Sequence, residues 1–587
     1  MSYRPIRFPR PDPAIAIYLA CSLLLAGCAA GATPVAPAPP PRILELRQEQ
    51  TEVPLYGKFE VVLTVERGAS ETSPAYDNPY DARQVELTAI FSDPEGREWV
   101  VPGFWDGEEA WRVRFTPSAE GEWSYRVVVR DRYGESEPRT GRFSCKGRIG
   151  SAPTEHHGWL QVGNRVNASY SPRYLVHHDG SPFYGIGHCN AFDLMSYGWD
   201  EKRGFTLFNT MASHGENMLV YWPIYSNPFF ASRYDQYSVP DMKVIDLVVE
   251  DAALKGIYLV FTIWNHDLLR DETHPWSRTN MGDWATHNGF RELVDLRSFF
   301  TDAEAWAWQE NLYRYIIARW GYSPAIGLWQ TVSEIEGTNA GIHADSWHER
   351  VNGYFVAHDP YRHPTTASKA GDAWWPAGYA VMDVVQMHSY NSQNDAAGTG
   401  PLIARWTQRM WEAQAKPNFI GEFGTTNQRL HPELLHNGIW AALSAGAAAT
   451  PMEWNDQGSW GRMTDEMYRH MSYLATFVSE LPLAHLNPTP LNLDISTRDG
   501  NFGGWGLLSA DRKLAVFWVQ LMEPATENVQ VTITELTPGE YLVRPFDTWE
   551  GVYLSTYRAS ADQTGRMTLA LPHFDKDIAV RLEMIEQ

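Results

Sequence analysis

The chain has 587 residues, of which 44% are hydrophobic and 20% charged, the balance of a folded globular protein. A chain of this length exceeds what one hydrophobic core supports, so we expect about three domains. The formal net charge of −23 argues against nucleic acid and against an anionic membrane surface as partners, because both attract basic proteins. The 25 tryptophans offer flat apolar faces, which suit the apolar faces of sugar rings.

The N-terminus reads as a targeting segment. Three arginines precede an apolar stretch, residues 14–25, that is too short to span a bilayer as a helix. The stretch ends in Leu25-Ala-Gly-Cys28, which resembles the lipobox of bacterial lipoproteins. This resemblance implies a signal peptide over residues 1–27, cleavage before Cys28, and a lipid on the sulfur of that cysteine.

The residue after the lipobox indicates where the anchor goes. Ala29 takes the place of the Asp that signals inner-membrane retention, so an outer-membrane anchor in the cell envelope is favoured. Residues 28–42 are rich in Pro and Ala and predict a semi-rigid tether. Only Cys145 and Cys189 remain in the folded part, and the sequence leaves open whether they form a disulfide.

Residues 43–150 show short β-patterned runs separated by turns. The runs 85–91, 111–115 and 123–129 alternate apolar and polar residues, and 93–96 reads as a turn. This spacing predicts an immunoglobulin-like β-sandwich. The stretches Tyr76-Asp-Asn-Pro-Tyr80 and Val101-Pro-Gly-Phe-Trp105 resemble a sandwich domain that precedes barrel glycosidases in many bacteria. No carboxylate pair points to chemistry here.

Residues 151–482 change to a rhythm of strand, loop and helix. Eight apolar strands alternating with amphipathic helices predict a (β/α)8 barrel, an α/β fold. The predicted strands are 183–189, 217–223, 258–264, 326–333, 365–368, 384–388, 418–421 and 448–453, and helices are predicted at 242–254, 302–320, 403–415 and 433–445. Residues 483–587 are β-rich again and predict a small C-terminal β-sandwich.

Two glutamates stand at the ends of predicted strands. Glu422 ends the seventh strand between two glycines, and Glu334 ends the fourth. On a closed barrel of parallel strands both side chains face the same mouth, although they lie 88 residues apart (422 − 334). Hydrolysis of a glycoside needs such a pair, one carboxyl protonated and one ionised. Glu336 is a second candidate on the fourth strand, less favoured because Gly337 indicates that the loop has begun.

With these residues the chain resembles the clan of retaining glycoside hydrolases built on (β/α)8 barrels, which includes cellulases. The resemblance rests on Phe419-Ile-Gly-Glu-Phe-Gly424 and implies Glu422 as nucleophile and Glu334 as acid/base. The clan usually has Asn before the acid/base, whereas this chain has Ser333. It also carries Tyr221-Trp222 at the end of strand two, where many members have Arg.

Other polar and aromatic residues fall at predicted strand ends, where the resemblance implies contacts with the sugar. Trp454 matches the stacking tryptophan of strand eight, and His388 with Tyr390 follows strand six near the nucleophile. The full set of expected substrate-binding residues is Trp222, Trp264, His266, Ser333, His388, Tyr390 and Trp454.

Two other functions stay open. A metal-dependent barrel hydrolase would use His at strand ends, but His188 is followed by Cys189 and Asn190 rather than by the His-x-His of that class. A surface glycan-binding lipoprotein without activity would have no use for both Glu334 and Glu422. We therefore expect a retaining glycoside hydrolase with a carbohydrate substrate, no cofactor or metal, and contact with a membrane only through the lipid on Cys28.

Overall fold

The structure is a computed structural model in which the described part of the chain begins at Pro39 and forms one compact unit. The predicted signal peptide, Cys28 and most of the predicted tether lie outside the described residues. Those residues are 39–70, 73–108, 110–147, 157–191, 193–277, 284–371, 373–458, 461–496, 501–522 and 529–585. Within this part of the chain, no helix combines the length and the apolar character that a membrane crossing needs.

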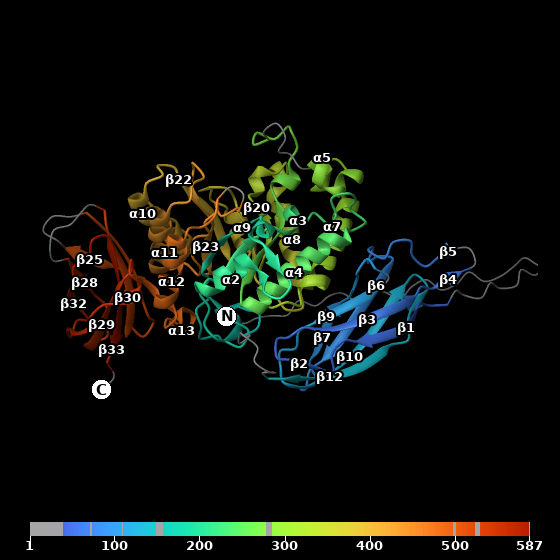
Figure 1. Ribbon diagram of the computed structural model, residues 1–587, viewed down its shortest axis with the longest axis horizontal. Coiled ribbons are helices and arrows are strands. Elements are labelled where there is room, and N and C mark those ends of the chain that lie inside the picture. The colour runs from blue at the N-terminus through green and yellow to red at the C-terminus, as the bar shows by residue number, and fades with distance from the viewer. Residues whose placement is uncertain are drawn as a thin grey trace, which may run out of the picture. The chain divides into compact units, whose positions relative to one another are not determined.

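The first part of the chain forms two sheets, drawn in blue in Figure 1. Their strand orders are β1-β3-β9-β8 and β2-β12-β10-β6-β7, with β11 beside β10. The strands are Arg42–Gln48 (β1), Glu52–Pro54 (β2), Phe59–Glu66 (β3), Val85–Ser92 (β6), Glu98–Pro102 (β7), Phe104–Trp105 (β8), Trp111–Phe115 (β9), Gly121–Asp131 (β10), Gly134–Glu135 (β11) and Arg139–Lys146 (β12), and a short hairpin joins Ala69–Ser70 (β4) to Ser73–Pro74 (β5).

Alternation along these strands builds their shared core. Every second residue of β6 is buried, as the sequence pattern predicts for a strand with one face turned inward. The rings of Phe59 and Phe143 stack with centroids 3.9 Å apart, and those of Phe91 and Phe115 stack at 4.0 Å. Residues of both sheets therefore bury one aromatic core. Cys145 lies buried at its edge as a free thiol, and Cys189 is also free, so the two do not form a disulfide.

The middle of the chain, green to orange in Figure 1, holds two sheets of parallel strands. One has the order β15-β18-β19-β20-β21 and the other pairs β22 with β23. The strands are Gly187–Cys189 (β15), Met218–Tyr221 (β18), Tyr258–Asn265 (β19), Ile326–Ser333 (β20), Thr365–Thr366 (β21), Val385–Asn391 (β22) and Asn418–Thr425 (β23), with short hairpins at Leu160–Val162 (β13) and Leu175–His177 (β14) and at Trp199–Asp200 (β16) and Gly204–Phe205 (β17).

Helices separate consecutive parallel strands, and polar side chains begin several of them. The Asp302 carboxylate accepts a hydrogen bond from the Ala305 amide at the start of α7, and Asp395 caps α10 in the same way. The helices are Gly163–Val166 (α1), Thr206–Ser213 (α2), Pro223–Ser226 (α3), Val239–Lys255 (α4), Trp284–His287 (α5), Leu296–Phe299 (α6), Ala303–Trp320 (α7), Ala344–His358 (α8), Pro376–Val381 (α9), Ala396–Ala413 (α10), Pro432–Ala445 (α11), Asp465–Val478 (α12) and Leu483–Leu486 (α13).

The predicted eighth strand, residues 448–453, forms no ladder and is a correction to the sequence prediction. It makes two isolated parallel bridges instead, Gly185 with Ala449 and Phe423 with Glu453. Pro451 lies in the middle of the segment and has no N–H to donate to a ladder. The Ala448 amide nevertheless donates to the Asn418 carbonyl at 2.8 Å, and the Thr450 amide to Gly185 at 2.8 Å. The segment thus runs between β23 and the chain that leads into β15.

One apolar cluster joins the two parallel sheets. It contains Val220 of β18, Val260 of β19 and Leu328 of β20, together with Phe419 of β23 and Met452. Side chains from all of these strands therefore face a common interior. A second and larger cluster lies between the strands and the helices.

The last part of the chain is again made of strands, red in Figure 1. The larger sheet has the order β24-β26-β27-β33-β29-β30 with β31 beside β29, the smaller has the order β25-β28-β32, and residues from both bury one core. The strands are Thr489–Leu491 (β24), Leu493–Ser496 (β25), Phe502–Leu508 (β26), Leu514–Leu521 (β27), Gln530–Ile533 (β28), Gly539–Asp547 (β29), Val552–Tyr553 (β30), Tyr557–Ala561 (β31), Met567–Ala570 (β32) and Asp577–Met584 (β33).

Candidate active site

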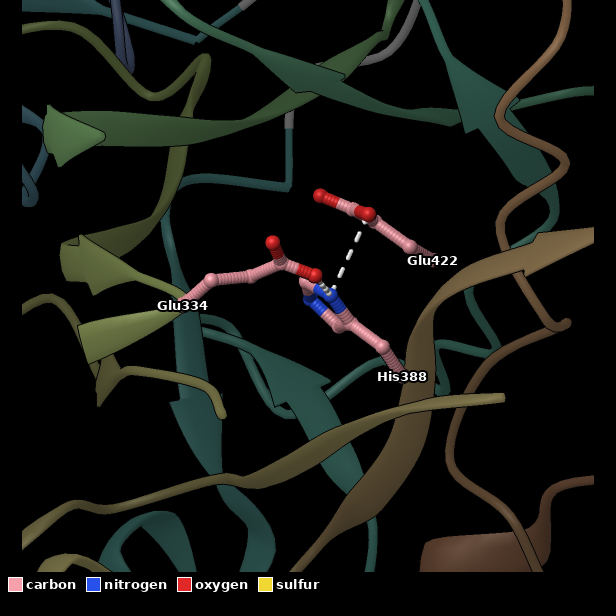
Figure 2. Close-up of side chains that lie close together, drawn as sticks. All are labelled: Glu334, His388 and Glu422. Atoms are coloured by element: carbon pink, nitrogen blue, oxygen red, sulfur yellow. Dashed lines mark hydrogen bonds and ion pairs between the residues drawn. The ribbon is translucent and has the colours of Figure 1, made fainter. Parts of the chain in front are cut away.

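The structure brings Glu334 and Glu422 together at the carboxyl ends of two parallel strands. Glu334 directly follows β20, and Glu422 lies in β23. One carboxylate oxygen of each, together with the Nδ1 atom of His388, lies within 4.8 Å of the others. Figure 2 shows the two carboxylates facing one another with the imidazole between their inner ends. Glu422 is 4% exposed, so the pair lies in a largely buried setting.

The backbone of Glu334 holds its side chain in place by an unusual conformation. Its φ angle is 57°, in the left-handed region that residues with a side chain seldom adopt. Such a conformation costs about 1–3 kcal/mol and is retained where the surroundings fix it, often at functional sites. Here the Glu334 amide donates to the Ser368 hydroxyl at 3.0 Å, which ties the end of β20 to the chain after β21.

His388 of β22 bridges the two carboxylates. Its Nδ1 atom lies 2.8 Å from Oε1 of Glu334 and 3.2 Å from Oε2 of Glu422. Burial alone would lower the pKa of His388, but the Glu422 charge and the hydrogen bond to Glu334 outweigh it and raise the pKa to about 10. The ring therefore carries a proton on both nitrogens and donates from both.

A chain of amides inside the sheets fixes the other ring nitrogen of His388. Nε2 lies 3.3 Å from the Oε1 atom of Gln386, which also accepts from the Gln330 amide at 3.1 Å. The Thr262 hydroxyl donates to the other end of Gln330 at 2.8 Å. This relay presents an oxygen, rather than an amide N–H, to His388 and so favours its charged form.

The same three side chains would be a candidate ligand set for a cation, since two carboxylates and an imidazole could each supply one atom. Against the effect of burial, the two carboxylates raise the pKa of His388, and a proton on its Nδ1 atom would satisfy the same contacts as a cation.

Tyr390 and His266 flank the carboxylates. The Tyr390 hydroxyl donates to Oε2 of Glu422 at 2.7 Å, and burial keeps the pKa of this phenol well above its usual value. The Nδ1 atom of His266 lies 3.6 Å from Oε2 of Glu334. Burial lowers the pKa of His266 to about 4, so this ring is neutral at physiological pH.

Two tryptophans stand beside His266. The rings of Trp222 and Trp454 lie 5.2 Å apart with planes inclined at 51°, and the edge of Trp222 meets His266 at 6.0 Å. Trp454 is partly exposed, whereas Trp222 is buried. Ser333 lies fully buried before Glu334, and within the described part of the chain its hydroxyl has no hydrogen-bond partner.

Trp264, expected from the sequence to bind substrate, is a core residue. It is fully buried, packs against the rings of Phe230 and Phe299, and donates from Nε1 to the Tyr313 hydroxyl of α7 at 2.9 Å. An indole enclosed in this way has no face left for a sugar ring. We therefore assign Trp264 to the packing of β19 against the helices.

Comparisons with known proteins bear on the fold. Residues 52–130 match a family described as a domain of unknown function, DUF5060. None of the curated proteins matches the sequence. The chain is similar in structure to a candidate glycoside hydrolase from Bacteroides vulgatus, with a TM-score of 0.62 and 17% identity, covering 91% of this chain and 100% of that one.

Two further structures agree. A family 5 glycoside hydrolase from Bacteroides vulgatus gives a TM-score of 0.50 and 14% identity, covering 73% of this chain and 94% of that one. Another glycoside hydrolase gives a TM-score of 0.50 and 14% identity, covering 73% of this chain and 97% of that one. The chain has the fold of glycoside hydrolases. At these identities the likeness shows the fold alone.

Glu336, the rival of Glu334 in the sequence, turns away from the pair. It lies in a short 3-10 turn, Ile335–Gly337 (η4), and its Oε1 atom accepts from the Ala370 amide at 2.8 Å. Burial raises its pKa. Glu336 thus lies in the loop after β20, where Gly337 indicated that the loop begins.

A third carboxyl beside the pair was missed in the sequence. Glu453 is fully buried next to Phe423, and its Oε1 atom accepts from the Asn455 side-chain amide at 2.6 Å. Burial raises the pKa of Glu453 to about 7. The signal was present, because Glu453 directly precedes Trp454 at the end of a predicted strand.

Proposed function

We propose that the chain is a retaining glycoside hydrolase in which Glu422 attacks the sugar and Glu334 gives and takes the proton. The observation that carries this proposal is the approach of one oxygen from each carboxylate to within 4.8 Å of the other. Retaining enzymes hold these groups about 5–5.5 Å apart, whereas inverting enzymes need about 6.5–9.5 Å to admit a water molecule. The short separation supports direct attack by a carboxylate.

The proposal includes a closed (β/α)8 barrel, with an immunoglobulin-like sandwich over 43–150 and a small sandwich over 483–587. The interior cluster that joins both parallel sheets supports it, as do the backbone hydrogen bonds that seat residues 448–453 between β23 and the chain before β15. In such a barrel the carboxyl ends of all strands surround one mouth. Glu334 and Glu422 would then act on one bound sugar from two sides.

In the first step, a carboxylate oxygen of Glu422 bonds to the anomeric carbon, and the bond from that carbon to the leaving oxygen breaks. Glu334 donates its proton to the leaving oxygen. Tyr390 and His388 both contact Oε2 of Glu422, which leaves Oε1 as the attacking atom. The two contacts also fix the direction from which this oxygen approaches.

In the second step, a water molecule attacks the same carbon and breaks the ester to Glu422. Glu334 accepts the proton from this water, and Glu422 returns to its ionised form. Two inversions give overall retention of configuration. The charged His388 stabilises the returning carboxylate, and neutral His266 lies on the Glu334 side without competing for its proton.

Trp222 and Trp454 complete the proposed site for the reacting sugar, a unit of an oligo- or polysaccharide. Partly exposed Trp454 offers the apolar face, and buried Trp222 supports it, with the two ring centroids 5.2 Å apart. Ser333 stands where related enzymes carry an Asn, and its hydroxyl is fully buried without a hydrogen-bond partner among the described residues. We also propose that Cys28 carries a lipid anchor at the outer membrane, a proposal that rests on the sequence Leu25-Ala-Gly-Cys28.

A panel of aryl β-glycosides and glycans tests the proposal with wild type, Glu422→Ala, Glu334→Ala and Glu336→Ala. We expect Glu422→Ala to lose turnover on every substrate. Turnover of glycans by Glu334→Ala should fall by about 10²–10⁴-fold. Turnover of aryl glycosides should fall far less, because their leaving group needs little protonation. Azide should rescue Glu334→Ala by attacking the glycosyl enzyme, and NMR should show a glycosyl azide with retained configuration.

The Glu336→Ala variant is the matched control, because it removes a neighbouring carboxylate that points elsewhere. Turnover that survives in Glu422→Ala would contradict the assigned nucleophile. Turnover that a chelator abolishes would contradict the role given to the proton on His388. A wild type that binds glycans from the panel but cleaves none would favour a surface glycan-binding protein instead.

A further inference from the structure

A half-exposed tryptophan stands on the Glu334 side of the proposed site. Trp276 lies in the loop after β19 and η2 (Asp267–Leu269), and 38% of it is exposed. Singly exposed apolar side chains are ordinary on protein surfaces, so the exposure alone does not indicate a ligand. The surroundings of this ring point to the ligand.

Hydrogen bonds fasten the Trp276 loop to the loop that carries the carboxyl. The Trp276 amide donates to Nδ1 of His274 at 3.1 Å, and Nε2 of His274 donates to the Glu336 carbonyl at 3.1 Å. A second tie joins the Asn339 amide to the Asp271 carboxylate at 2.9 Å. The indole is therefore held at a fixed place relative to Glu334, two residues before Glu336.

Gly337 provides the space in which the indole lies. A Cβ atom added at this position would lie 2.5 Å from Cζ3 and 2.7 Å from Cε3 of Trp276, closer than real Cβ atoms come to a neighbour. The conformation of Gly337 is not left-handed, so its backbone alone does not require glycine. The missing side chain instead lets the six-membered ring rest against the chain that follows Glu334.

One side chain separates Trp276 from the proposed acid. The ring centroids of Trp276 and His266 lie 5.9 Å apart with planes at 82°, and Nδ1 of His266 lies 3.6 Å from Oε2 of Glu334. In a glycosidase the acid stands on the side of the leaving group, because its proton goes to the leaving oxygen. An aromatic face just beyond the acid is therefore next to the leaving group.

We propose that Trp276 is a stacking platform for a pyranose ring in the leaving group, so that the substrate has a sugar on both sides of the bond that is cleaved. The inference rests on the proposed function and adds a residue that binds the sugar on the leaving-group side. The ring of the departing sugar lies on the exposed face of the indole, which Gly337 allows to approach the chain after Glu334.

The test compares two substrates of the same sugar with wild type and Trp276→Ala. One is the shortest oligosaccharide cleaved in a panel of cello-, manno-, xylo- and β-1,3-gluco-oligosaccharides. The other is the matching glycosyl fluoride, whose leaving group has no ring to stack. We expect Trp276→Ala to lower kcat/KM for the oligosaccharide by about 10- to 100-fold more than for the fluoride.

Two variants control the comparison. Trp306→Ala removes a partly buried indole from α7, where it packs under the Arg350 guanidinium. This variant should lower kcat/KM for the oligosaccharide and for the fluoride by the same factor, or leave both unchanged. Gly337→Ala should displace the indole and so lower kcat/KM for the oligosaccharide more than for the fluoride. When Trp276 is already replaced by Ala, adding Gly337→Ala should cause little of this further loss. Trp276→Phe, which keeps an aromatic face, should recover part of the loss.

The outcomes separate the platform from the chemistry. Equal losses on oligosaccharide and fluoride in Trp276→Ala would overturn the platform while leaving the carboxylate mechanism intact. Fluoride hydrolysis that persists in Glu422→Ala would overturn the mechanism and, with it, the platform. A wild type that cleaves the fluoride but no glycan of two or more sugars would overturn the platform alone.

Discussion

Glu453 shows how burial sets the charge of a single residue beside the proposed nucleophile. Only 1% of Glu453 is exposed, and its Oε2 atom has no hydrogen-bond partner among the described residues. Burial raises its pKa to about 7 from an ordinary value of 4.5, so the folded protein favours the neutral acid. A raised carboxyl pKa stabilises the fold below the unfolded value, and this contribution is lost as pH rises through the folded value.

Glu453→Gln should remove this pH dependence, because the amide stays neutral at every pH. In the wild type we expect the thermal midpoint to fall between pH 4.5 and pH 7 in part because Glu453 must ionise. The variant should show a smaller fall over that window. Scanning calorimetry at half-unit steps measures it, with Glu98→Gln, an exposed residue of β7, as the matched control. Identical slopes in the wild type and Glu453→Gln would contradict a neutral buried acid.

The sequence could predict which residues gather at this site but not how each side chain turns. Glu334 and Glu422 follow from strand order alone, since parallel strands bring their carboxyl ends to one edge. The packing of Trp264 against Phe230 and Phe299 did not follow, because every residue of β19 is buried. A strand buried on both faces has no alternation in its sequence that tells which side chains face the helices.

At the level of elements, local geometry explains why the predicted eighth strand does not pair as a regular strand. Residues 448–453 were predicted from their apolar run, and they do lie between β23 and the chain before β15. Pro451 interrupts the pairing, so the segment is held by two isolated bridges and by single backbone hydrogen bonds to its neighbours. Buried His188 holds its far end, although the sequence pointed to this residue only as a possible metal ligand at a strand end.

His188 of β15 fastens the loop that carries Trp454. Its Nδ1 atom lies 2.6 Å from Oε2 of Glu216, and Nε2 lies 2.9 Å from Oδ2 of Asp456. The other oxygen of Asp456 accepts from the Met463 amide at 2.8 Å. Burial would lower the pKa of His188, but the Glu216 charge and the hydrogen bond to Asp456 outweigh it and raise the pKa to about 10.

His188→Gln should destabilise the fold and disturb Trp454 together. The raised pKa means that His188 stabilises the fold fully below pH 6.5 and that this contribution is lost as pH rises towards 10. At pH 6 we expect a loss of about 3 kcal/mol, since two buried carboxylates lose their cation. Between pH 7 and pH 10 the stability of the variant should fall less steeply than that of the wild type.

Urea unfolding at pH 6, 8 and 10 measures the stability, and kcat and KM measured on one substrate report on Trp454. With Trp454 in its proposed contact with the sugar rather than with the bond that breaks, KM should rise more than kcat falls. His343→Gln, which removes an exposed imidazole, is the control. If the free energy of unfolding of His188→Gln fell as steeply with pH as that of the wild type, His188 would not be charged in the folded protein.

On the scale of the whole molecule, a buried ion network ties the N-terminal sheets to the helices of the middle region. Arg114 of β9 donates to Glu60 at 2.7 Å and to Asp246 of α4 at 2.9 Å. Asp246 also accepts from Arg319 of α7 at 2.6 Å and from the Trp320 indole at 2.8 Å. Glu60 and Arg114 both fall in residues 52–130, the part that matches a domain of unknown function. The contacts favour a structural role for that domain.

Asp246→Asn should therefore weaken the whole chain rather than one part of it. Burial would raise the pKa of Asp246, but the Arg114 and Arg319 charges lower it to about 2, so its contribution is present above pH 3.8 and is lost as pH falls towards 2. At pH 7 the variant leaves two buried guanidinium groups short of a carboxylate, which costs about 3–5 kcal/mol. Calorimetry should show one unfolding transition at a lower temperature.

An exposed ion pair across the same boundary gives the matched control. Arg83 lies 2.9 Å from Glu304 of α7, with 41% and 56% of their side chains exposed, and exposed pairs contribute about 0–1 kcal/mol. Glu304→Gln should thus leave the transition almost unchanged. If Asp246→Asn instead splits the transition in two, with the N-terminal sheets unfolding separately, the network couples two independent domains. The prediction of a single unfolding transition would then be wrong.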